Sequence, residues 1–345
     1  MPTPQQLSEG SPKLAEALEI AEKALSARLG NRVDRNVPLS GFTTFRLGGP
    51  ARVFLRAQNV HDLEALADVM AESVERMGCD IPITVIGQGS NLLIGDNGFL
   101  GVAIHLGGDF GQIAIEPNSA GSVFQVNAGA AVKLPVLARK CAASGCEGLG
   151  WMVGVPGSVG GAIRMNAGGH GSDVAANLQS VKIIDLSAKN SQRNRSVGAN
   201  NLSLHYRTSS LQKHQIVVSA TFECTQGDPS VLDEELTEIV RWRRANQPGG
   251  ANCGSVFTNP PDHSAGKLID DLGLRGFRLS PTATASVSEK HANFVQADPN
   301  GSSADVWALM VHVRSAVFAR YGIALHPEVQ TLGFDATLPS LAEVP

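Results

Sequence analysis

The sequence predicts a protein of mixed helix and strand that is divided into more than one domain. With 345 residues, the chain is long enough for two or three domains of ordinary size, each with its own core. From about residue 36 onward, short apolar segments with strand character alternate with amphipathic helical segments. Two glycine-rich loops interrupt this alternation, and a Gly-Asp-Pro turn at 227–229 marks the start of a last domain.

The first helix is predicted directly after Ser11 and Pro12, which are suited to a helix cap and a first turn. Gly30 follows the expected end of this helix. Its apolar residues fall on one face at helical spacing: Leu14, Leu18, Ala21, Leu25 and Leu29. We therefore expect residues 1–30 to form an N-terminal helical extension.

The next segments have the pattern of a β-α-β region followed by a mixed α/β region. Strands are expected at 51–55, 83–86, 100–106, 123–126, 181–185 and 215–222. Helices are expected at 61–77 and 134–143.

The last domain is expected to begin and end with a helix. Ser230 is the predicted cap of a helix that continues to Trp242 and carries basic residues near its C-terminal end: Arg241, Arg243 and Arg244. A final helix is predicted over 303–321, where apolar residues are spaced for one buried face. We expect the residues after Phe334 to form a loose tail.

The composition excludes several classes of protein. Hydrophobic residues make up 43% of the chain, charged residues 17%, and the net charge is −4, which fits neither wholesale disorder nor a polybasic nucleic-acid surface. No apolar run approaches the length of a membrane span, and the first ten residues lack the features of a secretory signal. The five cysteines form no CxxC pair, so we expect reduced thiols and no metal site. These features predict a cytoplasmic protein.

The two glycine-rich loops are the strongest functional signal from the residues themselves. The segment 154–161, which continues to 166–169, leaves backbone amides bare and favours an anion site of the kind that holds phosphates. The loop Gly-Gln-Gly-Ser-Asn at 87–91 is not a Rossmann fingerprint, because Leu92 stands where a third glycine is needed. Either loop alone is more often a turn between strands, but together they predict a site for the two phosphates of a dinucleotide.

The motifs of residues 36–334 resemble one family in their order and coverage. They lie at 43–49, 87–91, 155–161, 206–209, 254–260, 265–269, 287–294 and at Glu328. The chain is thereby similar to UDP-N-acetylenolpyruvoylglucosamine reductases, which belong to a larger FAD-binding superfamily. That resemblance implies an NADPH-dependent flavoenzyme of peptidoglycan precursor synthesis, which reduces the enolpyruvyl double bond of UDP-N-acetylglucosamine enolpyruvate to give UDP-N-acetylmuramate.

The same resemblance implies the fold and the domain limits. It predicts an α+β protein with a two-subdomain FAD-binding region of the vanillyl-alcohol-oxidase/PCMH type and a C-terminal α+β substrate domain. The expected limits are 31–108 and 109–228 for the two FAD-binding subdomains, 229–334 for the substrate domain and 335–345 for the tail. FAD is expected to bind non-covalently, the partner is a small UDP-sugar rather than a nucleic acid or a membrane, and the protein is expected to be a monomer.

The resemblance also assigns binding residues. The expected cofactor-binding residues are Gly87, Gln88, Gly89, Ser90, Asn91, Gly154, Pro156, Gly157, Ser158, Gly160, Gly161, Asn166 and Ala167. The expected substrate-binding residues are Asn259 and Lys267.

Three catalytic residues follow from the family motifs and fit the chemistry of the reaction. Reducing an enolpyruvyl double bond requires a hydride source, a group that stabilises negative charge and a proton donor. Arg207 suits the second role, because a guanidinium is always charged and binds a carboxylate through two hydrogen bonds. Ser255 matches the family's proton donor, and Glu328 matches the glutamate that stabilises or protonates the intermediate. A carboxylate beside a carbanion requires a raised pKa or an ion pair with Arg207.

The chain departs from the family pattern at several positions. His170 stands where a tyrosine is usual, Asn246 where a lysine is common, and Gln330 where an arginine is usual, and the connection 279–286 is longer than expected. The sequence has only two tyrosines, so it resembles the subgroup that lacks the tyrosine-bearing substrate loop. Two alternatives therefore stay open: another flavin-dependent oxidoreductase of the superfamily, or a flavin-binding regulatory protein with weakened catalysis.

Overall fold

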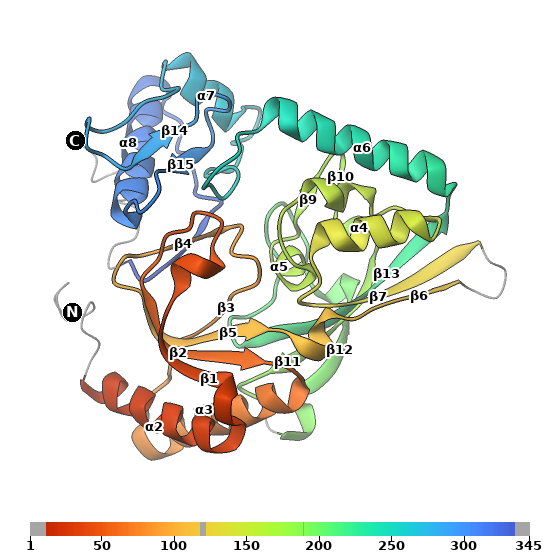
Figure 1. Cartoon of the computed structure of the whole chain (residues 1–345), viewed down its shortest axis with the longest axis vertical. Coiled ribbons are helices and arrows are strands. Elements are labelled where there is room, and N and C mark those ends of the chain that lie inside the picture. Colours follow the sequence, from red (N-terminus) through yellow and green to blue (C-terminus); the bar gives the residue numbers. More distant parts are fainter. Residues whose placement is uncertain (1–11, 118–121, 189, 335–345) are drawn as a thin grey trace.

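The computed structural model describes residues 12–117, 122–188 and 190–334. Two principal sheets lie side by side and carry helices on their outer faces, and a smaller C-terminal lobe sits against the first sheet (Figure 1). The predicted α+β class is confirmed.

The first sheet has the strand order β1-β2-β5-β3. Its strands are β1 (Val33–Pro38), β2 (Pro50–Ala57), β5 (Phe99–Leu106) and β3 (Ile83–Val85). The strands β2, β5 and β3 run parallel, whereas β1 is antiparallel to β2. The helix α3 (Val60–Met77) connects β2 to β3, and its first turn is capped by the Asn59 side chain, which accepts a hydrogen bond from the Asp62 amide at 3.2 Å.

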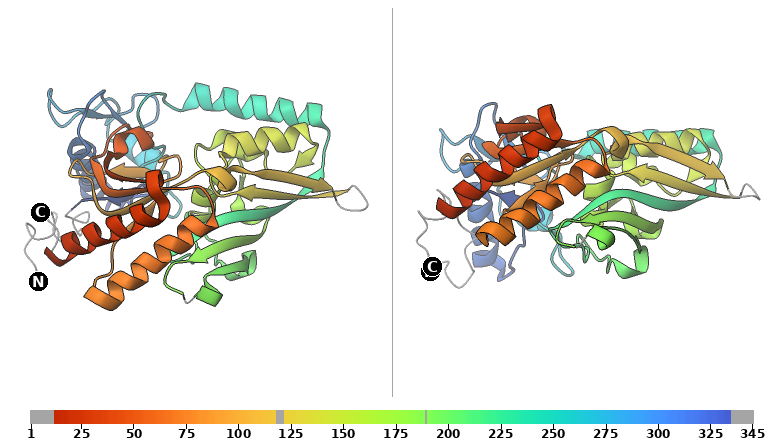
Figure 2. Two further views of the ribbon diagram at one scale, coloured as in Figure 1. Left: turned by 60° about the horizontal axis from the view of Figure 1, so that its bottom comes forward. Right: turned by 90° about the horizontal axis from the view of Figure 1, so that it is seen from below.

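The N-terminal helix α2 (Pro12–Leu29) lies beside α3 under the first sheet (Figure 2). Its buried residues are Ala17, Leu18, Ala21, Leu25 and Leu29, which confirms the predicted apolar face. The predicted cap Ser11 lies outside the described residues. The buried face joins the same core as β2 and β5, so this helix is an integral part of the first layer.

The second sheet is antiparallel and has the strand order β12-β11-β13-β7-β6, with β8 added beside β13. Its strands are β12 (Asn194–Gly198), β11 (Leu178–Asp185), β13 (Gln215–Gln226), β7 (Val123–Gly129), β6 (Ile113–Pro117) and β8 (Cys146–Glu147). The helices α4 (Leu134–Ala143) and α5 (Val159–Arg164) pack near one face of this sheet (Figure 1). A short hairpin of β9 (Gly168–Gly169) and β10 (Ser172–Asp173) follows α5.

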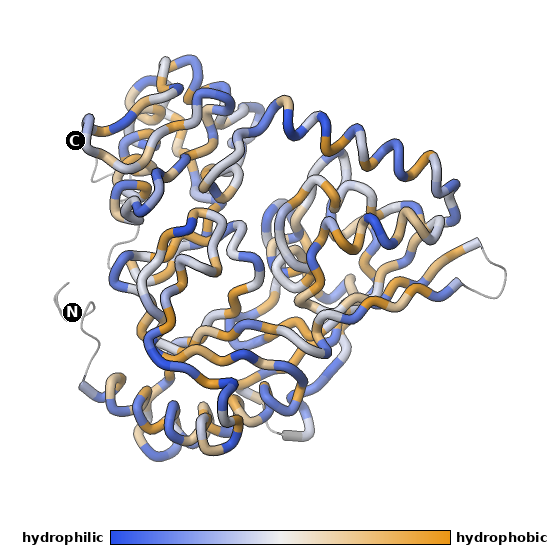
Figure 3. The backbone as a smooth tube through the Cα atoms, viewed as in Figure 1, coloured by the Kyte–Doolittle hydropathy of each residue, from blue (hydrophilic) through white to orange (hydrophobic). Residues whose placement is uncertain are grey.

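The long helix α6 (Pro229–Asn246) leads from the second sheet to the C-terminal lobe. Its cap is Asp228, whose Oδ1 accepts a hydrogen bond from the Ser230 amide at 2.8 Å, so the prediction of Ser230 as the cap was wrong. Pro229 occupies the first helical position, where its missing N–H costs nothing, and this moves Ser230 into the first turn. Polar and apolar residues alternate along α6 (Figure 3), and Leu232 and Leu236 belong to the large core.

Among the described residues, the C-terminal lobe contains two helices and a pair of strands of its own, and one further strand that pairs with a strand of the preceding region. Its elements are α7 (Ala265–Asp271), β14 (Ala285–Val287), β15 (Val295–Ala297), α8 (Ser303–Tyr321) and β16 (Gln330–Leu332). The strand β16 pairs in parallel with β4 (Leu92–Ile94), which follows the first glycine loop. Phe45, Leu47 and Leu93 also belong to the core of this lobe. The lobe is therefore built partly from residues of the first layer.

Asp96, in the turn after β4, ties the first layer to the start of α8. Its Oδ1 accepts a hydrogen bond from the Ser303 amide at 2.9 Å. Its Oδ2 accepts hydrogen bonds from the Ser302 hydroxyl at 2.7 Å and from the Ala304 amide at 3.1 Å. In addition, the Ser303 hydroxyl donates to the Ile94 carbonyl at 2.6 Å. These bonds fix α8 relative to the strand that leaves the first glycine loop.

Within the described residues, no helix is long and apolar enough to cross a membrane. The domain limits expected from the sequence stay a prediction, and the burial of Leu232 and Leu236 shows that the first half of α6 packs with the preceding residues.

Candidate active site

The two glycine loops meet between the sheets. The Ser90 hydroxyl of the first loop donates a hydrogen bond to the Pro156 carbonyl of the second at 2.8 Å. A Cβ atom on Gly87 would lie 2.4 Å from the Ser158 Oγ, and one on Gly89 would lie 2.0 Å from the Phe42 carbonyl oxygen. A larger residue at 87 would therefore push the two loops apart, and one at 89 would collide with the backbone of the Phe42 segment, which explains why both positions are glycine.

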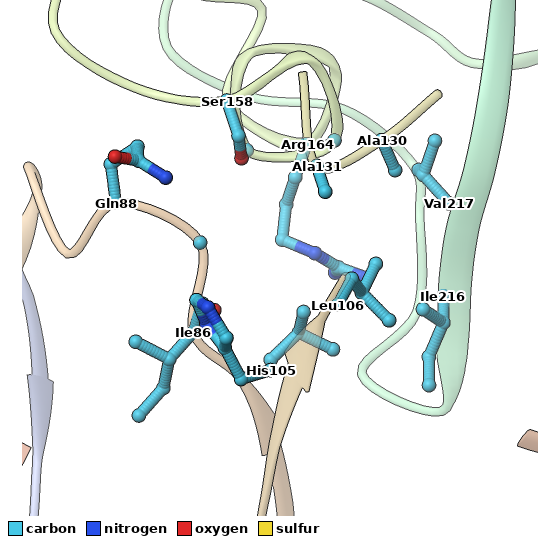
Figure 4. A pocket seen from close by; sticks show the side chains of 14 residues that line it. Ile86, Gln88, His105, Leu106, Ala130, Ala131, Ser158, Arg164, Ile216 and Val217 are labelled. Atoms are coloured by element: carbon cyan, nitrogen blue, oxygen red, sulfur yellow. The ribbon is translucent and has the colours of Figure 1, made fainter. Parts of the chain in front are cut away.

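A pocket opens where these loops face the ends of β5 and β13 (Figure 4). Five of the expected cofactor-binding residues line it: Gly87, Gln88, Ser158, Gly160 and Gly161. Its opposite wall is largely apolar and includes Leu106, Ile216 and Val217. The pocket thus combines glycine backbone, the Arg164 side chain and apolar side chains, which together fit a ligand that carries both phosphates and a flat ring. The residues present therefore fit a flavin dinucleotide.

Asn166 has a structural role that the sequence does not reveal. Its side chain is buried, and its Nδ2 donates to Asp173 Oδ2 and to the His205 carbonyl, both at 3.1 Å. Its Oδ1 accepts a hydrogen bond from the Ala175 amide at 3.1 Å. Asn166 thus joins the β9–β10 hairpin to the turn that carries Arg207. Contacts of Asn166 and Ala167 with the cofactor stay a prediction.

Arg207 and Glu328 form an ion pair, although they lie far apart in the sequence. Arg207 Nε is 2.6 Å from Glu328 Oε1, and the two side chains are 25% and 16% exposed. An Nη2 hydrogen of Arg207 also bonds to the Gly168 carbonyl at 3.2 Å. The guanidinium lies over the Tyr206 ring, with 5.3 Å between Cζ and the ring centroid. Charge pairing, a carbonyl and an aromatic face therefore hold Arg207 in one orientation.

Burial raises the pKa of Glu328 above its ordinary value, although Arg207 acts in the opposite direction. The raised pKa and the ion pair are the two features that a carboxyl group needs beside a developing negative charge. Burial raises the pKa of the Cys253 thiol, and the charge of Glu328 acts in the same direction.

Two neighbouring segments fix the backbone of Glu328. The Glu328 amide donates to the Val256 carbonyl at 2.8 Å, and the Glu328 carbonyl accepts from Asn91 Nδ2 at 3.1 Å. Ser255 immediately precedes Val256 and forms an antiparallel bridge with Phe294. The structure thus brings Glu328 into contact with Arg207 and places it next to the strand segment that carries Ser255. The sequence assigned Asn91 to the cofactor and gave no sign that it holds Glu328.

Of the two expected substrate-binding residues, Asn259 lies in the segment before α7 (Ala265–Asp271) and Lys267 lies in the first turn of that helix. Asn259 Oδ1 accepts a hydrogen bond from the Ala265 amide at 3.0 Å, which anchors the helix. Lys267 Nζ is 3.2 Å from Asp271 Oδ2, and its side chain is 74% exposed. Their binding of substrate stays a prediction.

The structure shows the contacts of the residues that depart from the family pattern. His170 packs edge-on against Trp242 with ring centroids 5.2 Å apart, and burial, followed by the charge of Arg243, lowers its pKa. Asn246 Nδ2 donates to the Trp242 carbonyl at 2.8 Å. The Gln330 amide donates to the Asn91 carbonyl at 3.0 Å. The connection 279–286 is stabilised near its start by a pair between Arg278 and Asp298 at 2.7 Å.

All five cysteines are free, and four of them are buried. Among the described residues, no group of three or more His, Cys, Asp or Glu side chains is arranged to hold a metal ion.

Comparison with known proteins agrees with this geometry. Residues 51–189 match the family described as FAD binding domain, and residues 246–332 match the family described as UDP-N-acetylenolpyruvoylglucosamine reductase, C-terminal domain. The first of these segments contains both glycine loops, and the second contains Ser255 and Glu328.

Individual relatives cover most of the chain. A UDP-N-acetylenolpyruvoylglucosamine reductase of Synechococcus sp. (strain RCC307) is 40% identical over 305 residues, which are 87% of this chain and 93% of the relative. The protein of the same name from Gloeobacter violaceus is 37% identical and covers 88% of this chain and 97% of its own. The crystal structure of UDP-N-acetylenolpyruvylglucosamine reductase from Thermus caldophilus superposes with a TM-score of 0.71 at 29% identity, covering 87% of this chain and 99% of that one. The chain therefore belongs to the UDP-N-acetylenolpyruvoylglucosamine reductase family.

Proposed function

We propose that this chain reduces the enolpyruvyl double bond of UDP-N-acetylglucosamine enolpyruvate, with FAD as cofactor and NADPH as reductant. Family membership supports the reaction and the cofactor. The observation that carries the assignment of the site is the ion pair between Arg207 and Glu328, because its carboxylate partner is tied through Asn91 to the loop that lines the cofactor pocket.

The residues that hold the cofactor are those of the two glycine loops. Gly87 and Gly161 carry no side chain, so their backbone amides can approach phosphate oxygens closely, whereas the Gly160 amide donates to the Ala130 carbonyl at 2.9 Å. Ser158 and Gln88 add polar groups to the same rim. Bound FAD, once NADPH has reduced it, would supply the hydride for the double bond.

Arg207 binds the carboxylate of the enolpyruvyl group and stabilises the negative charge that develops on it. A guanidinium remains charged at all relevant pH values, so its attraction for the intermediate does not depend on protonation. The hydrogen bond to the Gly168 carbonyl and the Tyr206 ring fix this side chain before substrate arrives. Such preorganisation is the main way in which an enzyme stabilises developing charge.

Ser255 and Glu328 are assigned to the protonation of the intermediate. Ser255 donates its hydroxyl proton to the carbanion. A serine hydroxyl is a weak acid and can protonate only a strongly basic atom at short range, and the carbanion is such an atom. Glu328, whose pKa is raised by burial, holds a proton more readily than an exposed glutamate and limits the repulsion of the intermediate. Asn259 and Lys267 are assigned to the polar part of the substrate.

The reaction is tested by following the flavin absorbance anaerobically. NADPH should bleach the purified, FAD-loaded protein, and the enolpyruvyl sugar nucleotide should then restore the oxidised spectrum. Bleaching without recovery would favour another flavin oxidoreductase. A spectrum that NADPH leaves unchanged would contradict the reductase assignment and favour the regulatory alternative.

We further propose that the protein acts as a cytoplasmic monomer on this small UDP-sugar. Sedimentation of the FAD-loaded protein at micromolar concentration should give a single species near the chain mass of 36.1 kDa. A species of twice that mass would contradict the monomer and indicate a dimer.

A further inference from the structure

Arg164 is a cation beside the cofactor pocket to which the sequence assigned no function. It is the last residue of α5, which follows the second glycine loop directly. Its side chain extends from α5 past Ala131 toward Leu106 and Ile216 (Figure 4), and it lines the pocket together with Gly87, Gly160 and Gly161.

The charge of Arg164 has no carboxylate partner. Among the described residues, no Asp or Glu oxygen lies within 4 Å of its guanidinium. Arg207, by contrast, forms an ion pair with Glu328. No acidic side chain lines the pocket either. Burial lowers the pKa of Arg164, which expresses the cost of removing this cation from water, but a guanidinium stays charged even so.

The hydrogen bonds of Arg164 orient it without neutralising it. Its guanidinium donates to the carbonyls of Leu211 and Gln212, both at 3.3 Å, and to the Gln215 carbonyl. A guanidinium has five N–H donors, so two remain for another acceptor. The Arg164 carbonyl accepts a hydrogen bond from the Ser209 hydroxyl at 2.7 Å. The side chain is thus held at the pocket by neutral carbonyls while its net positive charge is available.

We propose that Arg164 is the counter-ion of the diphosphate of FAD in this pocket. The inference rests on the proposed cofactor and adds an arginine to a site formed by glycine backbone and by the side chains of Ser158 and Gln88. The diphosphate is the strongly anionic part of the cofactor, and the amides beside Arg164 favour the same sign of charge. The ion pair of Arg207 lies with another pocket, lined by Asn166, Gly168 and Tyr206, so the two arginines serve different parts of the site.

The test measures FAD affinity of the apo-protein, prepared by removing FAD from the intact chain. Arg164→Gln should weaken FAD binding about 10- to 100-fold, the usual effect of removing one charge-assisted contact. Arg164→Lys keeps the charge but not the fork of donors, so it should lose less. Arg139→Gln is the matched control, because Arg139 is also an arginine that donates to a backbone carbonyl, Pro135 at 3.0 Å, but lies exposed on α4. FAD affinity should be unchanged in this control.

Riboflavin, which has no phosphate, separates a charge effect from a change of pocket shape. Its affinity should be the same in wild type and in Arg164→Gln, and an equal loss for riboflavin and FAD would overturn the proposal. An unchanged FAD affinity would also overturn it, as would a changed flavin redox potential with an unchanged affinity, which would place Arg164 at the flavin ring.

If Arg164→Gln does not fold without cofactor, Arg164→Lys decides by the same comparison. A loss of at least about threefold for FAD and none for riboflavin supports the counter-ion role, and equal losses contradict it. Failure of the wild-type protein to bind FAD would instead contradict the cofactor in the proposed function. The two failures are therefore distinguishable.

Discussion

In the proposed mechanism, Arg207 and Glu328 act as a pair, and burial and the neighbouring charge have opposite effects on the pKa of Glu328. The guanidinium favours the ionised carboxylate, but burial of Glu328 outweighs this attraction and the pKa of Glu328 rises. A pair balanced in this way stabilises negative charge through the arginine and avoids adding a full second negative charge beside the reacting carbon.

Replacement of Ser255 by alanine tests the proton donor. Ser255→Ala should lower the rate of enolpyruvyl reduction about 10²- to 10⁴-fold, the usual contribution of a general acid. Reduction of the flavin by NADPH should continue, because that step needs no proton from Ser255. Stopped-flow measurement of the two half-reactions separates these effects, and an equal loss in both would refute the assignment.

The raised pKa of Glu328 predicts a pH-dependent effect on stability. Because the folded-state pKa lies above the unfolded-state value, the folded protein binds more protons between the two, and the contribution of this group to stability is lost as the pH rises through the folded-state pKa. Glu328→Gln imitates the protonated form. It should therefore unfold at a higher temperature than wild type at neutral pH, with the difference vanishing near pH 4, below the unperturbed pKa of about 4.3.

Thermal unfolding followed by circular dichroism at several pH values measures this difference. Glu238→Gln is the control, because Glu238 is exposed on α6 and forms no ion pair in the described part of the chain. A melting temperature of Glu328→Gln below that of wild type at neutral pH would show that the ion pair outweighs burial.

At the scale of elements, Asp96 is the contact that orders α8 against the first layer. Removing a side-chain cap typically costs about 1–2 kcal/mol, so Asp96→Ala should lower the free energy of unfolding by about this amount. Burial alone would raise the pKa of Asp96, but hydrogen bonds from Ser302, Ser303 and Ala304 lower it. The contribution is therefore present above the ordinary pKa of aspartate and is lost as the pH falls through the folded-state value.

Urea unfolding of wild type and Asp96→Ala at pH 7 and near pH 3 measures this contribution. We expect the two proteins to differ at neutral pH and to converge in acid. A difference of the same size at both pH values would mean that the charge of Asp96 is unimportant and that the side chain acts through packing alone.

The spacing of apolar residues and the cap residues predicted most helices and strands, but they did not predict contacts between segments that are distant in the sequence. The helices at 134–143 and 303–321 have the predicted bounds, since spacing and caps lie within a few residues. Ser230 failed as a cap because the helix already begins at Pro229, so Ser230 lies in the first turn and its own amide donates to the cap Asp228. The bond of Asp96 with Ser302 spans 206 residues, and no local pattern contains it.

The candidate site was predictable to a similar extent. The family motifs indicated Arg207, Ser255 and Glu328, and the structure confirms that Arg207 contacts Glu328. The sequence did not predict the hydrogen bond from Asn91 to the Glu328 carbonyl, nor that Arg164 would lie at the pocket without a carboxylate partner among the described residues. Both depend on which segments meet in three dimensions.

At the scale of the whole molecule, the C-terminal lobe depends on the first layer. Phe45, Leu47 and Leu93 complete its core, and β16 has its partner in β4. The segment 246–334 expressed alone should therefore lack a cooperative urea transition, because this apolar surface would be exposed to water. Circular dichroism against urea concentration measures this, with the full chain as control. A sigmoidal transition of the isolated segment would contradict the prediction.

The pairing of β4 with β16 also constrains how the protein is made. During synthesis, β4 leaves the ribosome long before its partner exists, since Asn91 and Glu328 beside the two strands are 237 residues apart. Until then its edge is open to wrong partners, including other nascent chains. Because the same late contact holds Glu328, the proposed pair of Arg207 and Glu328 can form only after residue 328 has been synthesised.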